Sequence, residues 1–278
     1  MSQPDAALIS HVRKAVIPAA GRGTRLRPAT RLLPKELLPI GNTPMIHRAV
    51  LELVRGGIDQ IVLIISPAKA SVWDYFAEIA EGLNCELELL IQPEPTGTAN
   101  AIALAEPFLQ GEPFVIFMPD EVCFCNRSPI AQLCEAYLHY RQPVLALTWL
   151  APEWAPYFKG TGRINLELLQ DLTYRITQLL DKTMDPFPVS RSGSFKGVGI
   201  GVVGPEFLQL LHQLKPEPGP QKEYDDIVIW QHLTQTQQLL GSAVDGIIFD
   251  AGQPQGFAAA NRWWLEFCQQ EDYVRLPD

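Results

Sequence analysis

The first half of the chain alternates short apolar runs with longer amphipathic stretches. Continuous apolar runs bounded by turn residues indicate buried strands, while apolar residues spaced three and four apart indicate helices. The predicted strands cover residues 15–19, 60–66, 85–92, 113–120 and 143–150. The predicted helices cover residues 44–56, 68–82, 97–109 and 128–140. This alternation favours βαβ units and a doubly wound α/β fold, with a mostly parallel sheet covered on both faces.

The pattern changes after residue 160. Two segments with alternating polarity, 162–169 and 174–181, are separated by a short polar turn, which predicts an antiparallel hairpin ending at Asp181 and Lys182. Further strands are expected at 195–203 and 245–251, and further helices at 205–214, 225–240 and 254–270. We therefore expect a smaller antiparallel lobe inserted late in the α/β core.

Composition narrows the classes of partner. With 278 residues, 47% of them apolar, the chain can bury the core of one large domain. A net charge of −9 argues against nucleic acid or an anionic membrane surface as a partner. The N-terminus has no long apolar run, no stretch approaches the length of a membrane span, and five irregularly spaced cysteines form no disulfide framework. A cytoplasmic location is the resulting expectation.

One stretch departs from this acidic character. Residues 19–39, AAGRGTRLRPATRLLPKELLP, hold four arginines and a lysine and follow a predicted buried strand. Glycines let backbone N–H groups approach a phosphate, and arginine grips phosphate oxygens in pairs, so the loop is predicted to bind a polyphosphate. It is neither a Rossmann fingerprint, because position 26 is leucine, nor a Walker A loop, because the Gly-Lys-Ser/Thr ending is absent.

The same residues carry a resemblance to a known family. The sequence resembles the signature of the sugar-1-phosphate nucleotidylyltransferases, most closely the bacterial UTP–glucose-1-phosphate uridylyltransferases, at Gly21, Gly23, Thr24, Arg25, Pro28, Thr30, Pro34, Lys35 and Leu38-Pro39. The resemblance runs from about residue 13 to 265. It implies a Rossmann-like nucleotidyltransferase core, with a nucleotide-binding half (13–150), a sugar-phosphate-binding half (151–265), and tails at 1–12 and 266–278.

The resemblance also implies roles for the nucleotide-binding half. Arg25 and Lys35 would bind the triphosphate and act in catalysis. Gln92 and Gly97 stand where the family reads a pyrimidine, although a strand-end glutamine such as Gln92 can also cap a loop. The remaining nucleotide-binding positions of the first loop are Ala20, Gly21, Gly23 and Thr24.

Two aspartates resemble the family's metal ligands. Asp120 ends a predicted buried strand, and Asp250 lies in an Asp-x-Gly turn, so the resemblance implies a Mg²⁺ site. Both residues also fit unrelated strand-end caps. Glu121 is adjacent to Asp120, but alternation along a strand is expected to point it the other way.

The sugar-binding positions match the family less well. Gly162, Asp181, Lys182 and Gly199 are the positions that the resemblance assigns to the sugar phosphate. Asp181 stands where the family has glutamate, Thr183 stands where it has proline, and the 221–230 segment keeps Glu223 without the usual Leu-Thr-Asp run.

The expected reaction is transfer of a nucleotidyl group from a nucleoside triphosphate, UTP favoured, to a sugar 1-phosphate, glucose 1-phosphate favoured. The departures keep three alternatives open: a weakened sugar-nucleotide sensor, a pyrophosphorylase that uses dTTP or another nucleotide, and a sugar-nucleotide-dependent glycosyltransferase. The aromatic residues Trp263, Trp264 and Phe267 leave open core packing or a homo-oligomer contact through the last helix.

Overall fold

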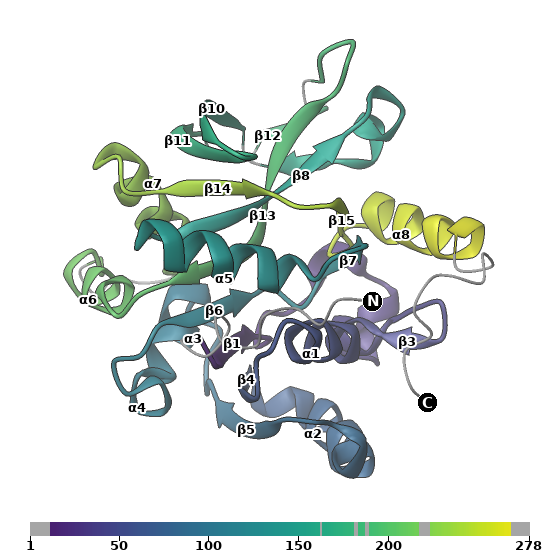
Figure 1. The fold of residues 1–278 in the computed structure, drawn as a ribbon. Helices are drawn as coiled ribbons and strands as arrows, with labels where there is room; N and C mark the ends of the chain where they lie inside the picture. The colour runs from purple at the N-terminus through teal and green to yellow at the C-terminus, as the bar shows by residue number, and fades with distance from the viewer. Residues whose placement is uncertain (1–11, 162, 181–182, 187–188, 217–222, 268–278) are drawn as a thin grey trace.

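The computed structural model describes residues 12–161, 163–180, 183–186, 189–216 and 223–267 and is organised around one central sheet (Figure 1). Its nine strands are β1 (Lys14–Pro18), β4 (Gln60–Ile65), β5 (Glu86–Ile91), β6 (Phe114–Phe117), β8 (Val144–Leu150), β10 (Ile164–Gln170), β11 (Thr173–Leu179), β13 (Ser194–Val203) and β14 (Leu240–Ala243). They follow the order β10-β11-β14-β8-β13-β6-β1-β4-β5.

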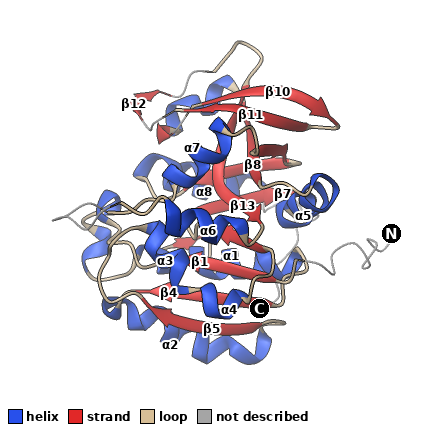
Figure 2. Cartoon of the chain, turned by 90° about the vertical axis from the view of Figure 1, so that its left-hand side faces the viewer, coloured by secondary structure: helices blue, strands red, loops and turns tan. Residues whose placement is uncertain are grey.

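Helices cover both faces of this sheet (Figure 2). Alternate strand residues supply the two interfaces: Ala15 and Ile17 pack in one apolar cluster, and Val16 packs in the other. The first cluster includes residues of α1 (Met45–Arg55), α2 (Ala70–Ile79) and α5 (Pro129–Tyr140). The second includes residues of α3 (Thr98–Leu104), α4 (Glu106–Leu109), α6 (Glu206–Gln213) and α7 (Ile227–Gln235).

The strand directions confirm the predicted doubly wound, mostly parallel fold. β1 pairs in parallel with β4 and β6, and β4 pairs in parallel with β5, so these strands end at one edge of the sheet. β13 runs antiparallel between β6 and β8. The predicted hairpin forms as β10 and β11, and it extends the central sheet through β14. A separate small antiparallel pair joins β9 (Lys159–Thr161) to β12 (Thr183–Pro186).

Several predicted boundaries differ from the structure. The helix expected from Pro44 begins at Met45, because β3 (Thr43–Pro44) pairs with β2 (Pro39–Ile40). The helix expected over 225–240 ends at Gln235, and the chain then enters β14. The strand expected to end at residue 120 stops at Phe117, and a new strand, β7 (Glu121–Cys125), follows the turn.

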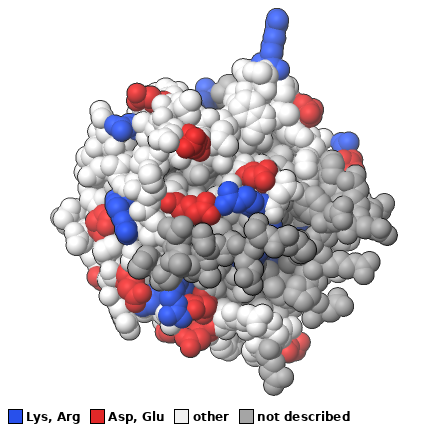
Figure 3. All heavy atoms as spheres, in the orientation of Figure 1, with Lys and Arg blue, Asp and Glu red and all other residues white. Residues whose placement is uncertain are grey.

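A third apolar cluster supports the end of the chain. β7 pairs antiparallel with β15 (Gly246–Asp250), and α8 (Pro254–Phe267) covers this ribbon. Trp263 packs against Phe124 and Phe249, and Trp264 packs over Gly41, so both indoles take part in contacts within this chain. None of the helices in the described ranges is both long enough and apolar enough to span a bilayer. The described residues seen in Figure 3 mix basic and acidic side chains without a continuous basic patch.

Candidate active site

The glycine-rich loop begins where β1 ends, and it folds back on itself. Gly23 adopts a left-handed conformation (φ 61°), and its carbonyl accepts a 2.7 Å hydrogen bond from the Thr30 hydroxyl. A Cβ atom at position 23 would lie 3.3 Å from the Cβ of Lys35. Glycine is therefore suited both to the backbone conformation and to the close approach of Lys35.

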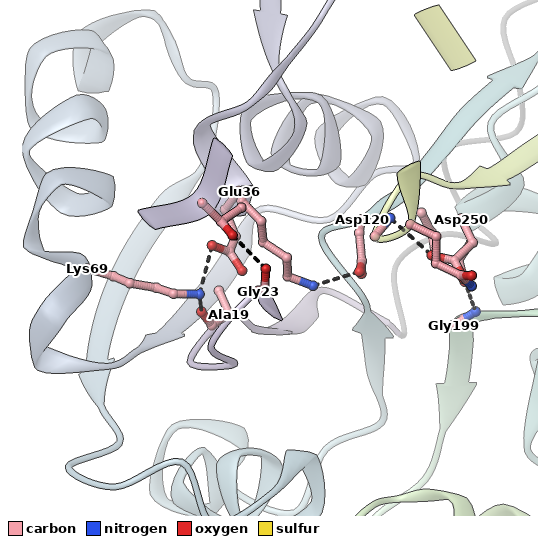
Figure 4. Close-up of polar contacts among 12 residues, drawn as sticks. Ala19, Gly23, Glu36, Lys69, Asp120, Gly199 and Asp250 are labelled. Atoms are coloured by element: carbon pink, nitrogen blue, oxygen red, sulfur yellow. Dashed lines mark hydrogen bonds and ion pairs between the residues drawn. The ribbon is translucent and has the colours of Figure 1, made fainter. Parts of the chain in front are cut away.

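Lys35 reaches from this loop to the end of β6 (Figure 4). Its Nζ atom lies 2.6 Å from Oδ2 of Asp120, and the two side chains are 17% and 16% exposed. Burial alone would lower the pKa of Lys35, but the charges of Asp120 and Glu36 outweigh it and raise that pKa. Burial alone would raise the pKa of Asp120, but the charge and hydrogen bond of Lys35 outweigh it and lower that pKa. Both groups are therefore charged at neutral pH.

Asp250 lies next to Asp120, although the two residues are far apart in sequence. The β7–β15 ribbon pairs Asp250 with Glu121, and the backbone N–H of Ala251 donates to the Asp120 carbonyl at 2.8 Å. The Asp250 carboxylate accepts hydrogen bonds from Gly252 N–H and Gln253 Nε2. A Cβ atom at Gly252 would lie 2.1 Å from the Asp120 carboxylate and 3.1 Å from that of Asp250. The turn thus places the two carboxylates side by side and leaves no space for a side chain at position 252.

Gln92 and Gly97 flank a loop after β5. Gln92 is 4% exposed, and its Nε2 atom donates to Thr96 Oγ1 and to the carbonyl of Gly97. Gly97 has φ 109°, and a Cβ atom there would lie 2.2 Å from the carbonyl oxygen of Tyr224. The structure therefore shows a second requirement for glycine at position 97, besides the approach of a base expected from the sequence. The backbone there packs directly against the segment that contains Tyr224.

One cavity of about 530 Å³ connects these features. It is bounded by the glycine-rich loop, the ends of β5 and β6, the middle of β13, and the 223–230 segment. The site residues predicted from sequence that line it are Ala20, Gly21, Gly23, Thr24, Arg25, Lys35, Gln92, Gly97, Asp120, Gly199 and Asp250. The predicted positions Gly162, Asp181 and Lys182 lie outside the described residues.

Comparison with known proteins identifies the family. A model of the nucleotidyl transferase family matches residues 14–263. This chain is a nucleotidyl transferase. Named UTP–glucose-1-phosphate uridylyltransferases are among its relatives. The Pseudomonas aeruginosa enzyme is 27% identical over 94% of this chain and 98% of its own, and a Bacillus subtilis enzyme is 26% identical over 95% and 94%.

Solved structures show the same nucleotidyl transferase fold. The crystal structure of a UDP-glucose pyrophosphorylase complexed with UDP-glucose superimposes with a TM-score of 0.77 and 24% identity, covering 92% of this chain and 99% of that one. Nucleotidyl transferases of this family typically use a divalent metal ion.

The carboxylates of this nucleotidyl transferase suit a hard cation. Asp120 and Asp250 offer oxygen ligands beside the basic loop, the ligand type that divalent cations such as Mg²⁺ take. Among the described residues no three His, Cys, Asp or Glu side chains converge on one point. A site with two protein carboxylates leaves coordination positions for water and phosphate oxygens, as is usual for Mg²⁺ bound with a nucleotide.

The expected orientation of Glu121 is wrong. The chain turns sharply before β7, where Glu121 N–H donates to the Met118 carbonyl, so strand alternation does not separate Glu121 from Asp120. Glu121 lines the cavity, and its Oε1 atom accepts a 2.7 Å hydrogen bond from Gly199 N–H. Burial raises the pKa of Glu121 to about 7, although the positive charge of Lys196 acts to lower it. Its Oε2 atom is buried without a hydrogen-bond partner among the described residues.

Sequence reasoning also missed buried lysines at the site. Lys196 lines the cavity from β13, and Lys69 lies behind the glycine-rich loop, 2.7 Å from Glu36. Lys196 is the one charged residue in a glycine-rich apolar strand. Glu36 directly follows Lys35 in the sequence, but no pattern there points to Lys69. A charged residue within an otherwise buried strand was the available signal for Lys196, whereas nothing in the sequence indicates that Lys69 meets Glu36.

Gly252→Ala should lower kcat/KM for nucleotidyl transfer about tenfold, because its Cβ would displace the Asp120 carboxylate from beside Asp250. The divalent-metal concentration needed for half-maximal rate should rise as well. Gly82→Ala is a matched control, since a Cβ there meets nothing within 4 Å. Steady-state kinetics of both variants tests the assignment, and an unchanged metal requirement in Gly252→Ala would contradict it.

Proposed function

We propose that this chain transfers the uridylyl group of UTP to glucose 1-phosphate, forming UDP-glucose and pyrophosphate. The observation that carries the proposal is the convergence of the basic glycine-rich loop and the paired carboxylates on one cavity. Relatives named for this reaction align over nearly the whole chain. The proposal makes 13–150 the nucleotide-binding half and 151–265 the sugar-phosphate-binding half, although strands of both halves alternate within one sheet.

The chemistry requires positioning and charge neutralisation more than proton transfer. The attacking oxygen of a sugar 1-phosphate is already ionised, so no general base is needed. In the proposed roles, backbone N–H groups of the loop from Ala20 to Thr24 hold the triphosphate, while Arg25 and Lys35 bind its outer phosphates and stabilise the departing pyrophosphate. The Asp120–Lys35 ion pair holds the Lys35 ammonium in the cavity before substrate binds.

Asp120 and Asp250 are the proposed Mg²⁺ ligands. When bound, Mg²⁺ neutralises phosphate charge and stabilises the crowded α-phosphorus. The two carboxylates are held by different means: Asp250 by the N–H of Gly252 and the Gln253 amide, and Asp120 by the Lys35 ammonium. Asp120 would offer the cation the same carboxylate that pairs with Lys35, and the Lys35 ammonium would be available to phosphate.

Base recognition is assigned to Gln92 and Gly97. The hydrogen bonds from Gln92 Nε2 to Thr96 and Gly97 fix the side-chain amide at the cavity wall. Its amide oxygen would accept the N3–H of uracil. Gly199, together with Gly162, Asp181 and Lys182, is proposed to contact the sugar phosphate. The four described cysteines are free, which fits the proposed location in a reducing cytoplasm.

Pyrophosphate release tests the proposal. Purified protein is incubated with UTP, dTTP, ATP, GTP or CTP against a panel of sugar 1-phosphates, with Mg²⁺ or with a chelator. Release that requires UTP, glucose 1-phosphate and Mg²⁺ would support the proposed reaction. Preference for another pair would replace the substrates and keep the mechanism. Nucleotide binding without release from any pair would refute the enzyme assignment and favour the sensor.

A further inference from the structure

Lys196 is a buried cation that has no carboxylate in ion-pair contact among the described residues. It lies in β13 opposite Thr148 of β8 and is 3% exposed. Its Nζ atom donates to the Gly197 carbonyl at 3.1 Å and lies 5.6 Å from the centroid of the Phe158 ring. No carboxylate of the described residues lies within 4.0 Å of it. A carbonyl and a ring face compensate only part of the cost of burying an ammonium group.

Glu121 feels the charge of Lys196 without forming an ion pair with it, so the surroundings of Lys196 favour a further, bound anion. Lys196 lines the same cavity as Asp120 and Asp250. The Nζ atom carries three N–H donors, and the Gly197 carbonyl is its one hydrogen-bond acceptor among the described residues. A phosphate in the cavity would accept from the remaining donors and supply the missing charge.

The sheet order places Lys196 on the opposite side of Asp120 from the basic loop. β6 leads into Asp120, and its two neighbours in the sheet are β1, which leads into the glycine-rich loop, and β13, which carries Lys196.

Aromatic contacts connect Lys196 with the strand that carries the second carboxylate. The Lys196 ammonium lies over Phe158, whose ring stacks on Phe249 with centroids 5.7 Å apart. Phe249 immediately precedes Asp250. These contacts hold Lys196 against the strand that carries Asp250, whereas the Lys35 ammonium contacts Asp120.

We propose that Lys196 binds the phosphate group of the sugar 1-phosphate and positions it to attack. The inference rests on the proposed function and adds a substrate-binding residue to it. In-line transfer places the attacking and leaving groups on opposite sides of the α-phosphorus. Cations on opposite sides of the aspartates match this requirement: Arg25 and Lys35 meet the leaving pyrophosphate, and Lys196 meets the attacking phosphate. A phosphate oxygen forms the new bond to the α-phosphorus, and the bond to pyrophosphate breaks.

Lys196→Met tests the assignment, because methionine keeps much of the volume and removes the charge. The KM for glucose 1-phosphate at saturating UTP should rise about 10- to 100-fold, the usual loss for a charged hydrogen bond. The Kd for UTP should change less than about twofold, since Lys196 lies away from the triphosphate loop. Lys196→Arg should recover part of the affinity for glucose 1-phosphate.

The matched control is Lys14→Met. Lys14 is also buried, at 5% exposed, but it pairs with Glu112 and does not line the cavity. Both substrate constants should stay unchanged in this variant, and circular dichroism checks that each variant folds. An unchanged KM for glucose 1-phosphate in Lys196→Met, or an equal loss of UTP affinity, overturns the inference. If Lys196→Met does not fold, Lys196→Gln is judged by the same criteria.

A binding measurement separates this inference from the proposed function. Glucose 1-phosphate is added to protein saturated with Mg²⁺ and the non-reacting α,β-methylene analogue of UTP, and the melting temperature is recorded. A rise in wild type that is lost in Lys196→Met supports the inference even if no sugar 1-phosphate yields pyrophosphate. No rise in wild type, or the same rise in both proteins, refutes it.

Discussion

Replacing Lys35 with methionine should lower kcat for pyrophosphate release about a hundredfold, because one well-placed charge supplies on the order of 3 kcal/mol of transition-state stabilisation. Lys35 is the loop cation in direct contact with a carboxylate of the cavity, at 2.6 Å. In the proposed mechanism, the Lys35 ammonium would meet the charge that develops on the leaving pyrophosphate. Single-turnover kinetics at saturating UTP measures the loss in the chemical step.

The same variant should show a change of opposite sign in metal binding. Lys35 Nζ donates a hydrogen bond to Asp120 Oδ2, so the ammonium would compete with a metal cation for that carboxylate. Lys35→Met should therefore reach half-maximal rate at a lower Mg²⁺ concentration even as the maximal rate falls. A variant damaged only in its folding would not combine these two effects. Lys14→Met, at a buried lysine that pairs with Glu112 and does not line this cavity, is the matched control, and full activity in Lys35→Met would contradict the catalytic role.

The residues at the ends of strands were accessible from sequence alone. The basic glycine-rich segment after an apolar run carried the resemblance to the family, and the resemblance assigned Asp120 and Asp250 to a metal site. The structure brings Lys35, Asp120 and Asp250 to one cavity. The fold class and the family followed from the same pattern, because apolar periodicity and the first motif are both local signals.

The parts that sequence reasoning missed depend on contacts between distant segments. Glu121 enters the cavity because a turn after Met118 starts a new strand, and Pro119 within that turn was the available sign that the first strand had ended. Lys196 faces the cavity because β13 inserts antiparallel between β6 and β8, a placement that its own sequence does not encode. Gly97 is required by Tyr224, which lies far along the chain.

The Lys69–Glu36 pair is the other feature that only the structure reveals, and it leads to the largest expected effect on stability. Lys69 Nζ lies 2.7 Å from Glu36 Oε2 and also donates to the Ala19 carbonyl at 2.6 Å. Burial lowers the pKa of Lys69 despite the opposing charge of Glu36. One lysine therefore holds both the start of the glycine-rich loop and the residue next to Lys35 (Figure 4).

Lys69→Met should reduce the free energy of unfolding by about 3–5 kcal/mol, the cost of removing one partner from a buried ion pair. Glu36 is 0% exposed, its Oε1 atom has no hydrogen-bond partner among the described residues, and Lys69 is the partner of its Oε2 atom. The variant therefore leaves a carboxylate buried without compensation. Urea unfolding measured by circular dichroism gives the change.

A double-mutant cycle identifies the cause. Glu36→Gln alone removes the negative charge and leaves Lys69 without its counter-ion, while Lys69→Met with Glu36→Gln removes both charges together. If the buried charge is responsible, the double variant should be more stable than Lys69→Met, so the two losses should fall well short of additive. Additive losses would mean that the two side chains act independently. The Ala19 carbonyl loses its Lys69 donor in Lys69→Met and in the double variant. UTP affinity should therefore be reduced in both variants, even where the double variant regains stability. That result would separate the support of the glycine-rich loop from the stability of the fold.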